Sequence, residues 1–313
     1  MRLTYTLLTF CSITLCDTSR IPFDRAMGKH HPLYAHYFDR IAQNHDALSV
    51  YNTFAQMYAQ NYQLLQHTAK LKIPKIIHQI WLGSEMPAEY LCLMRSWQKH
   101  HPDWEYILWT DDMIEALNLT NQDLYDTAIN YGERSDIARY EILYRFGGLY
   151  ADTDFECVQS FDALHKSFDL YAGIELPGMA SFLSTIILSN GIIGSKPGHP
   201  ILKECITALR TKKNAQDILQ RTGALVFMEQ FLCHANIHGT DDIALPALYL
   251  YPIDKKTKDP ATIASCIQPY TYAIHHWAGS WILKERAFVP GIKIKTRQEG
   301  NVLKFRIVDE RTT

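Results

Sequence analysis

The sequence lacks the short motifs that identify several common protein classes. Its seven cysteines form no C-x-x-C pair, so the spacing of a zinc finger or a thiol–disulfide motif is absent. The nucleotide-binding G-x-x-x-x-G-K-[ST], the hydrolase G-x-S-x-G and the metalloprotease H-E-x-x-H are also missing. The 31 basic residues do not outnumber the 33 acidic ones, and the net charge of −2 argues against a nucleic-acid partner.

Long apolar runs are scarce as well. The run near the N-terminus, residues 3–16, is shorter than the ~20 apolar residues that span a bilayer. It suits the apolar part of a signal peptide, although its exit at Cys16 makes a mediocre cleavage site. We expect residues 1–20 to be a signal peptide or short anchor, which implies a secretory or membrane-associated protein. A buried N-terminal element of a cytoplasmic protein is the alternative.

The sequence contains enough apolar material for a large core, since 47% of its 313 residues are hydrophobic. From residue 73 onward, short apolar runs alternate with helical patterns. The runs predict strands over 75–83, 104–112 and 149–155, and the patterns predict helices over 88–101 and within 111–146. This alternation predicts an α/β fold, with a mostly parallel sheet, flanking helices, and ligands at the carboxyl ends of the strands.

Two flanking segments have a different character. Residues 33–70 contain no proline or glycine and repeat apolar side chains every three or four positions, which predicts two helices or one bent helix. We expect residues 21–70 to form a helical appendage to a main domain over 71–285. Residues 286–313 alternate on both sides of a glycine-containing turn, which predicts a C-terminal β-hairpin.

The triplet Asp152-Thr153-Asp154 follows an apolar strand pattern. Two carboxylates this close raise each other's pKa unless a cation neutralises them. If the strand continues through the triplet, residues i and i+2 share a face and both carboxylates can meet one ion. A hard cation such as Mn²⁺ or Mg²⁺ takes oxygen ligands and substrate phosphates, so the triplet predicts a clamp for a diphosphate. A solvated loop is the alternative for an isolated D-x-D.

The helix that precedes this strand carries a second pair of charges. Asp136 and Arg139 are three residues apart and share a helix face. They form a local ion pair, or Arg139 makes a bidentate contact with a phosphate or a sugar hydroxyl.

The run from Ser135 to Asp154, SDIARYEILYRFGGLYADTD, resembles the signature of the DXD-containing glycosyltransferases of family 32. This family includes the yeast Golgi α-mannosyltransferases, and the clostridial glucosylating toxins are more distant relatives. IPKIIHQIWLG (residues 73–83) resembles the family's first strand, and HHWAGSW (residues 275–281) resembles a late segment. The resemblance covers residues 73–285.

The resemblance implies a GT-A fold and a retaining transfer of a hexose from a UDP- or GDP-sugar to a glycan, lipid or protein acceptor, with Mn²⁺ or Mg²⁺ as cofactor. The leaving phosphate would itself take the acceptor proton. The implied catalytic residues are Asp152, Asp154, Arg139 and Trp281. The implied donor-binding residues are Trp81, which would stack on the base, with Asp136, Arg139, Tyr150, Ser280 and Trp281. The implied metal ligands are Asp152, Asp154 and His276, with His275 as the alternative histidine.

Two other functions compete with this one. A protein that binds sugar nucleotides or glycans without turnover would show metal-dependent donor binding and no release of product. A D-x-D phosphohydrolase would release phosphate from phosphomonoesters, but it carries its aspartates near the start of the domain, whereas Asp154 lies deep in the chain.

Overall fold

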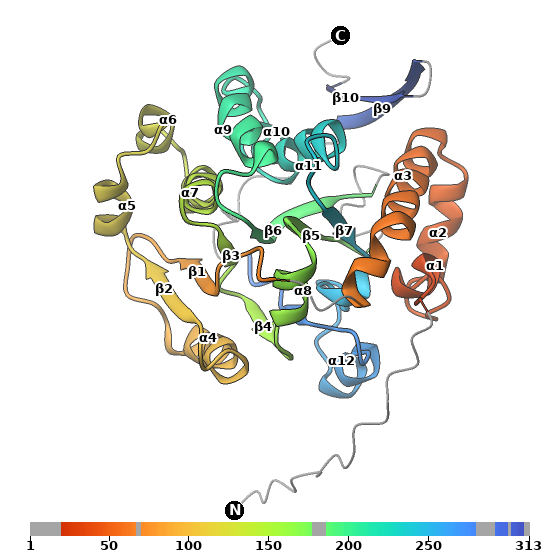
Figure 1. Ribbon diagram of the computed structural model, residues 1–313, viewed down its shortest axis with the longest axis horizontal. Coiled ribbons are helices and arrows are strands. Elements are labelled where there is room, and N and C mark those ends of the chain that lie inside the picture. Colours follow the sequence, from red (N-terminus) through yellow and green to blue (C-terminus); the bar gives the residue numbers. More distant parts are fainter. Residues whose placement is uncertain (1–19, 67–69, 177–185, 280–291, 300–301, 310–313) are drawn as a thin grey trace, which may run out of the picture.

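The computed structural model describes residues 20–66, 70–176, 186–279, 292–299 and 302–309, the last two ranges as backbone only. Its centre is a six-stranded sheet in the order β2-β1-β3-β6-β5-β7 (Figure 1). The strands are β1 (Ile76–Ile80), β2 (Glu105–Trp109), β3 (Gly148–Ala151), β5 (Leu170–Ile174), β6 (Leu188–Ser195) and β7 (Asp242–Leu245). β6 is antiparallel to both of its neighbours, and the other described pairs of this six-stranded sheet are parallel. The predicted α/β fold with a mostly parallel sheet is confirmed.

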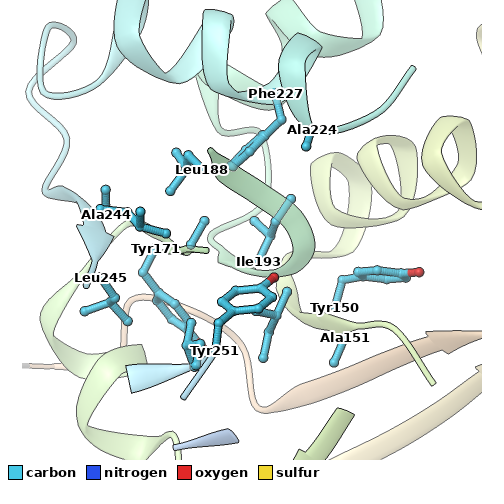
Figure 2. Packing of buried hydrophobic residues seen from close by; sticks show 14 of the residues in the cluster. Tyr150, Ala151, Tyr171, Leu188, Ile193, Ala224, Phe227, Ala244, Leu245 and Tyr251 are labelled. Atoms are coloured by element: carbon cyan, nitrogen blue, oxygen red, sulfur yellow. The ribbon is translucent and has the colours of Figure 1, made fainter. Parts of the chain in front are cut away.

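Helices cover the sheet on both faces (Figure 1). On one side lie α7 (Tyr131–Phe146), α9 (Pro200–Lys212), α10 (Ile218–Arg221) and α11 (Ala224–His234). On the other side lie α4 (Ala88–His100), α8 (Asp162–Ser167) and α12 (Pro260–Cys266). The other described helices beyond residue 70 are α5 (Asp111–Leu117), α6 (Gln122–Asp126) and the 3-10 helix η2 (Ala247–Tyr249). Figure 2 shows part of the core, where apolar side chains of β3, β5, β6, β7 and α11 gather with Tyr251.

The helices predicted in the N-terminal segment are present as α2 (Ala35–Ala42) and α3 (His45–Asn61), preceded by α1 (Phe23–Ala26) and followed by η1 (Tyr62–Gln66). α3 packs beside β7 at the edge of the sheet. The rings of Phe54 and Phe231 lie 6.4 Å apart, and the hydroxyls of Tyr58 and Tyr249 hydrogen-bond at 3.0 Å. The segment predicted as an appendage is therefore packed into the same core as the sheet.

Helix α7 ends where the chain must turn sharply into β3. Its last residue is followed by Gly147 and Gly148, whose φ angles of 64° and 98° disfavour any residue with a side chain. A Cβ on Gly148 would also lie 2.6 Å from the carbonyl oxygen of Ile76. The two glycines therefore let β3 pair closely with β1, and they set where Asp152 emerges from the sheet.

The prediction that the D-x-D triplet continues its strand is wrong. β3 ends at Ala151, and the triplet forms a turn closed by a hydrogen bond from the Phe155 N–H to the Asp152 carbonyl, 3.1 Å. The chain then enters β4 (Phe155–Cys157), which pairs antiparallel with β8 (Ala273–His275) in a separate small sheet. The two carboxylates are brought together by the turn and not by strand periodicity.

The predicted C-terminal hairpin is present as β9 (Ile292–Glu299) and β10 (Val302–Asp309), which lie near α3 and α11 (Figure 1). Residues 1–19, for which a leader was predicted, lie outside the described residues. Within the ranges that the structure covers, no helix is both long and apolar enough to cross a membrane. The described cysteines, Cys92, Cys157, Cys205, Cys233 and Cys266, are free thiols.

Candidate active site

The candidate site lies at the end of the sheet where the parallel strands have their carboxyl ends. Trp81 follows β1, Asp152 follows β3 and Glu175 follows β5. Because β6 runs in the opposite direction, its first residues, including Asn190, lie at the same end. In sheets of this kind, ligands bind at this end.

Arg139 joins α7 to the D-x-D turn. Its Nη2 lies 3.1 Å from the Asp136 carboxylate and 3.2 Å from Oδ1 of Asp152, and its Nη1 donates to the Asn190 carbonyl at 2.6 Å. The guanidinium also lies over the Tyr150 ring, 4.5 Å from its centroid. The Tyr150 hydroxyl donates to the same Asp152 oxygen at 2.7 Å. Asp152 is therefore fixed through Oδ1, while no residue of the described ranges forms a hydrogen bond with its Oδ2.

Burial and neighbouring charges shift the pKa values of the ionisable groups in this cluster. It raises the pKa of Asp136 to about 6, although Arg139 and the amide of Asn190 act in the opposite direction. Burial alone would lower the pKa of Arg139, but the surrounding acidic groups, with Asp152 foremost, together outweigh it and the pKa is raised. The guanidinium is 5% exposed and stays charged, so it can neutralise part of a bound anion.

Asp154 is held from the other side by the β8 segment. Nε2 of His275 donates to its Oδ1 at 3.0 Å, and the N–H of Ala278 donates to its Oδ2 at 2.9 Å. Burial alone would raise the pKa of Asp154, but these contacts, with His275 foremost, hold it below its ordinary value. Burial of the His275 ring likewise opposes its charge, yet Asp154 raises the pKa of the imidazole.

Asp152, Asp154 and His275 together have the composition of a divalent metal site. One ligand atom from each lies within 4.8 Å of the others. Two carboxylates and an imidazole suit Mn²⁺, which accepts oxygen and nitrogen ligands. His275 would have to give up its Nε2 proton to hold a metal through that nitrogen, because a ligating imidazole is neutral at the ligating nitrogen. The residues therefore fit a metal.

The adjacent residues His275 and His276 form hydrogen bonds with different carboxylates. His276, the predicted metal ligand, places Nε2 2.9 Å from the Glu156 carboxylate, while His275 lies with the aspartates. His275 ends β8 and His276 follows it, and their contacts show that His275, not His276, faces the D-x-D turn. The structure puts His275 in the place for which His276 was predicted.

The other predicted donor residues fall into two groups. Trp81 is half-buried at the end of β1, and its ring is 4.8 Å from that of Tyr90. Its buried indole N–H has no hydrogen-bond partner within the part of the chain that the structure describes. Tyr150 and Asp136 lie in the Arg139 cluster described above. Ser280 and Trp281 lie outside the described residues.

Several residues of the site gave no recognisable signal in the sequence. The Asn190 amide donates to Asp136 at 2.8 Å, and the Thr222 hydroxyl donates to the other oxygen of Asp136 at 3.0 Å. Trp277 adopts a left-handed φ of 54°, and its ring lies 4.1 Å from that of His275. This uncommon backbone conformation directs the next N–H, that of Ala278, to Asp154.

Comparison with known proteins agrees with this geometry. Residues 87–169 match the family model described as "Glycosyltransferase sugar-binding region containing DXD motif". This segment includes the Arg139 cluster and both aspartates. Residues 87–169 therefore match the DXD-containing region of this glycosyltransferase family, and the resemblance predicted from the sequence is confirmed for this segment.

Individual relatives cover different parts of the chain. Inositol phosphoceramide mannosyltransferase 3 of Schizosaccharomyces pombe is 35% identical over 141 residues, which are 44% of this chain and 37% of the relative. Mannosyl phosphorylinositol ceramide synthase CSH1 of Saccharomyces cerevisiae is 35% identical over 147 residues, 45% of this chain and 37% of the relative. The chain thus spans 37% of the length of each of these yeast relatives.

An uncharacterized glycosyltransferase, L373 of Acanthamoeba polyphaga mimivirus, is 29% identical over 222 residues, 67% of this chain and 84% of the relative. Among solved structures, the PaToxG glycosyltransferase superposes with a TM-score of 0.46 at 18% identity, covering 64% of this chain and 80% of that one.

Proposed function

We propose that this protein is a retaining glycosyltransferase that moves a hexose from a nucleotide-diphosphate sugar to an acceptor, with Mn²⁺ or Mg²⁺ held by Asp152, Asp154 and His275. The observation that carries the proposal is the convergence of these three side chains beside the charged guanidinium of Arg139. This arrangement suits a leaving group that carries two or more negative charges.

The residues would divide the work between binding and charge stabilisation. A divalent cation at the cluster would neutralise charge that develops on the departing diphosphate. Arg139 would orient Asp152 and donate a hydrogen bond to the nucleotide sugar. Asp136 would accept hydrogen bonds from hydroxyl groups of the sugar. Trp81, whose indole N–H has no partner among the described residues, would contact the base. Ser280 and Trp281 keep the roles that the resemblance implies for them.

The relatives suggest which substrates to test first. Two yeast relatives carry the names of a mannosyltransferase and a mannosyl phosphorylinositol ceramide synthase. We therefore propose mannose as the first sugar to test, supplied as GDP-mannose, and a glycolipid with a polyol headgroup as the first acceptor. UDP-glucose, UDP-galactose and UDP-N-acetylhexosamine complete the donor panel.

The test measures release of nucleoside diphosphate from each donor with Mn²⁺ present. Asp154→Asn should reduce release on the order of 10³-fold, because the cation loses a charged ligand. Asp112→Asn, an exposed aspartate on α5, is the matched control and should keep the wild-type rate. Unchanged release in Asp154→Asn would contradict the proposal. Metal-dependent donor binding without release would favour a binding protein, and phosphate release from phosphomonoesters would favour a phosphohydrolase.

A further inference from the structure

A cavity of about 330 Å³ lies outside the cluster formed by Asp152, Asp154 and His275. Four neighbouring helices surround it: α6 with the loop 127–129 that follows, α7, α9 and α10 (Figure 1). Its volume falls within the range of about 300–1,000 Å³ that is common for small-molecule sites. None of the described residues proposed above to bind the donor or the metal lines this cavity.

One part of the cavity wall is apolar. Leu124 and Ala128 line it from the α6 side, Ile137 from α7 and Leu209 from α9. Ile129 also lines the cavity, and it is 53% exposed, so much of its apolar surface is in contact with water. An apolar group of a ligand that packs here would remove its own surface and that of the wall from water, which favours binding.

The polar part of the wall carries a net positive charge. Lys213, which follows α9, is exposed and forms no ion pair within the ranges that the structure describes. Arg221 of α10 pairs through Nε with one oxygen of Glu133 and donates from Nη1 to the Ala215 carbonyl at 2.6 Å. The other Glu133 oxygen accepts from the Ile129 N–H at 2.9 Å, so both oxygens are engaged. Two cations and one carboxylate leave a single positive charge on the wall.

One residue belongs both to the cavity and to the Arg139 cluster. Thr222 lines the cavity, and its hydroxyl donates to Oδ2 of Asp136 at 3.0 Å. Thr222 is 3% exposed, and its carbonyl accepts from the Tyr140 hydroxyl at 2.9 Å. Helix α7 makes a second connection, because Ile137 of the apolar wall directly follows Asp136. A ligand that displaces Thr222 would therefore displace the partner of Asp136.

We propose that this cavity is an effector site for a small amphiphile with an apolar chain and one carboxylate, such as a medium-chain fatty acid. The chain packs on the apolar wall, and the carboxylate pairs with Lys213 at the polar part. A monoanion matches the single positive charge there. Occupancy changes the affinity for the nucleotide sugar, because Thr222 connects the cavity to Asp136. This effect on the donor rests on the proposed function, whereas binding of the amphiphile does not.

The first experiment measures binding of octanoate by calorimetry in the absence of Mn²⁺. Acetate carries the charge without the chain, and octan-1-ol carries the chain without the charge. Octanoate should bind at least about 10-fold more tightly than acetate, because its methylene groups are buried. It should bind about 2- to 5-fold more tightly than octan-1-ol, because its ion pair forms at an exposed lysine. Octanoate that binds no more tightly than either reference compound would overturn the site.

Two variants locate the bound octanoate. Lys213→Gln should remove the advantage of octanoate over octan-1-ol, whereas Lys203→Gln, an exposed lysine earlier on α9, is the matched control and should preserve it. Ala128→Phe adds a ring to the apolar wall and should weaken both compounds at least about 10-fold. Circular dichroism of each variant checks that it is folded. Unchanged octanoate affinity in folded Lys213→Gln and Ala128→Phe would place the ligand elsewhere and overturn the proposal.

The second experiment measures the affinity for GDP-mannose and the other donors of the panel with Mn²⁺, with and without saturating octanoate. The wild-type affinity should change at least about 5-fold. Thr222→Val should still bind octanoate but lose this change, and Thr222→Ser, which keeps the hydroxyl, should retain it. Octanoate binding without any change in donor affinity would refute the effector role. A wild type that binds no donor even without octanoate would instead refute the proposed function.

Discussion

Nε2 of His275 lies 3.0 Å from Oδ1 of Asp154, although 121 positions separate the two residues in the chain. The pairing of β4 with β8 creates this contact, because it aligns Phe155 with His275 and leaves Asp154 at the start of the small sheet. The two-stranded sheet of β4 and β8 thereby holds the D-x-D turn and His275 next to each other.

The first prediction distinguishes the two histidines of the β8 segment. His275→Ala should weaken Mn²⁺ binding and slow nucleoside diphosphate release about 10- to 100-fold, because one of three ligands is lost. His276→Ala is the matched control, since its ring pairs with Glu156 and not with the aspartates. Titration of each variant with Mn²⁺ by calorimetry measures the difference. A larger loss in His276→Ala would contradict the assignment.

The second prediction concerns the guanidinium in the site. Arg139→Met leaves the carboxylates of Asp136 and Asp152 without their buried cation, so the free energy of unfolding should fall by about 3–5 kcal/mol. Urea denaturation measures this change. In the exposed pair of Arg210 with Asp123, Arg210→Met should cost less than about 1 kcal/mol. Equal losses in the two variants would show that Arg139 is not a buried neutralising charge.

The third prediction uses the glycine of the site. Gly191→Ala places a methyl group 3.0 Å from Oδ2 of Asp152, so the carboxylate must shift and the release rate should fall on the order of 10²-fold. Gly198→Ala provides the contrast. There the added methyl meets nothing within 4 Å, but φ is +69°, so stability should fall about 1–2 kcal/mol without a rate effect. A normal rate in Gly191→Ala would contradict the tight fit.

The fourth prediction concerns pH and a buried histidine outside the site. The His78 ring donates from Nε2 to the Gly147 carbonyl at 2.9 Å and accepts at Nδ1 from the Trp109 indole at 3.1 Å, which requires the neutral ring. Burial lowers the pKa of His78 to about 4 from an ordinary 6.5. The unfolded chain therefore binds this proton first as the pH falls.

His78 should then contribute stability that is complete above about pH 6.5 and is lost progressively toward pH 4, on the order of 3 kcal/mol in total. Urea denaturation at several pH values measures the loss, and the ring nitrogens of His78 observed by NMR should remain neutral at pH 5.5. The ring of His45, which is 91% exposed, is the solvent-accessible reference signal in the same spectra. Protonation of His78 above pH 6 would refute the assignment.

Local patterns in the sequence were sufficient to predict β1, β2, α7 and the C-terminal hairpin, because the apolar period and the glycine pair at 147 and 148 act over a few residues. The same patterns located Asp152, Asp154 and Arg139. They failed at the D-x-D turn, where the apolar run suggested a longer strand than the one that forms.

The rest of the site depends on contacts between distant segments. Asn190 reaches Asp136 only because β6 runs antiparallel to its neighbours, a direction that the apolar run around it did not specify. Tyr251 lies in an irregular segment, and its side chain packs closely against Gly173 and Gly191, where a side chain would collide with it or crowd it. No periodicity encodes such placements, so they required the structure.

The order in which the ribosome makes the chain has a consequence for the β4–β8 ladder. The six strands of the main sheet are complete once Leu245 has emerged, but the partner of β4 follows about thirty residues later. A nascent chain can therefore bury most of its core before β8, which carries His275 of the proposed metal site, has been synthesised. Ligand capture would thus be among the last properties the growing polypeptide acquires.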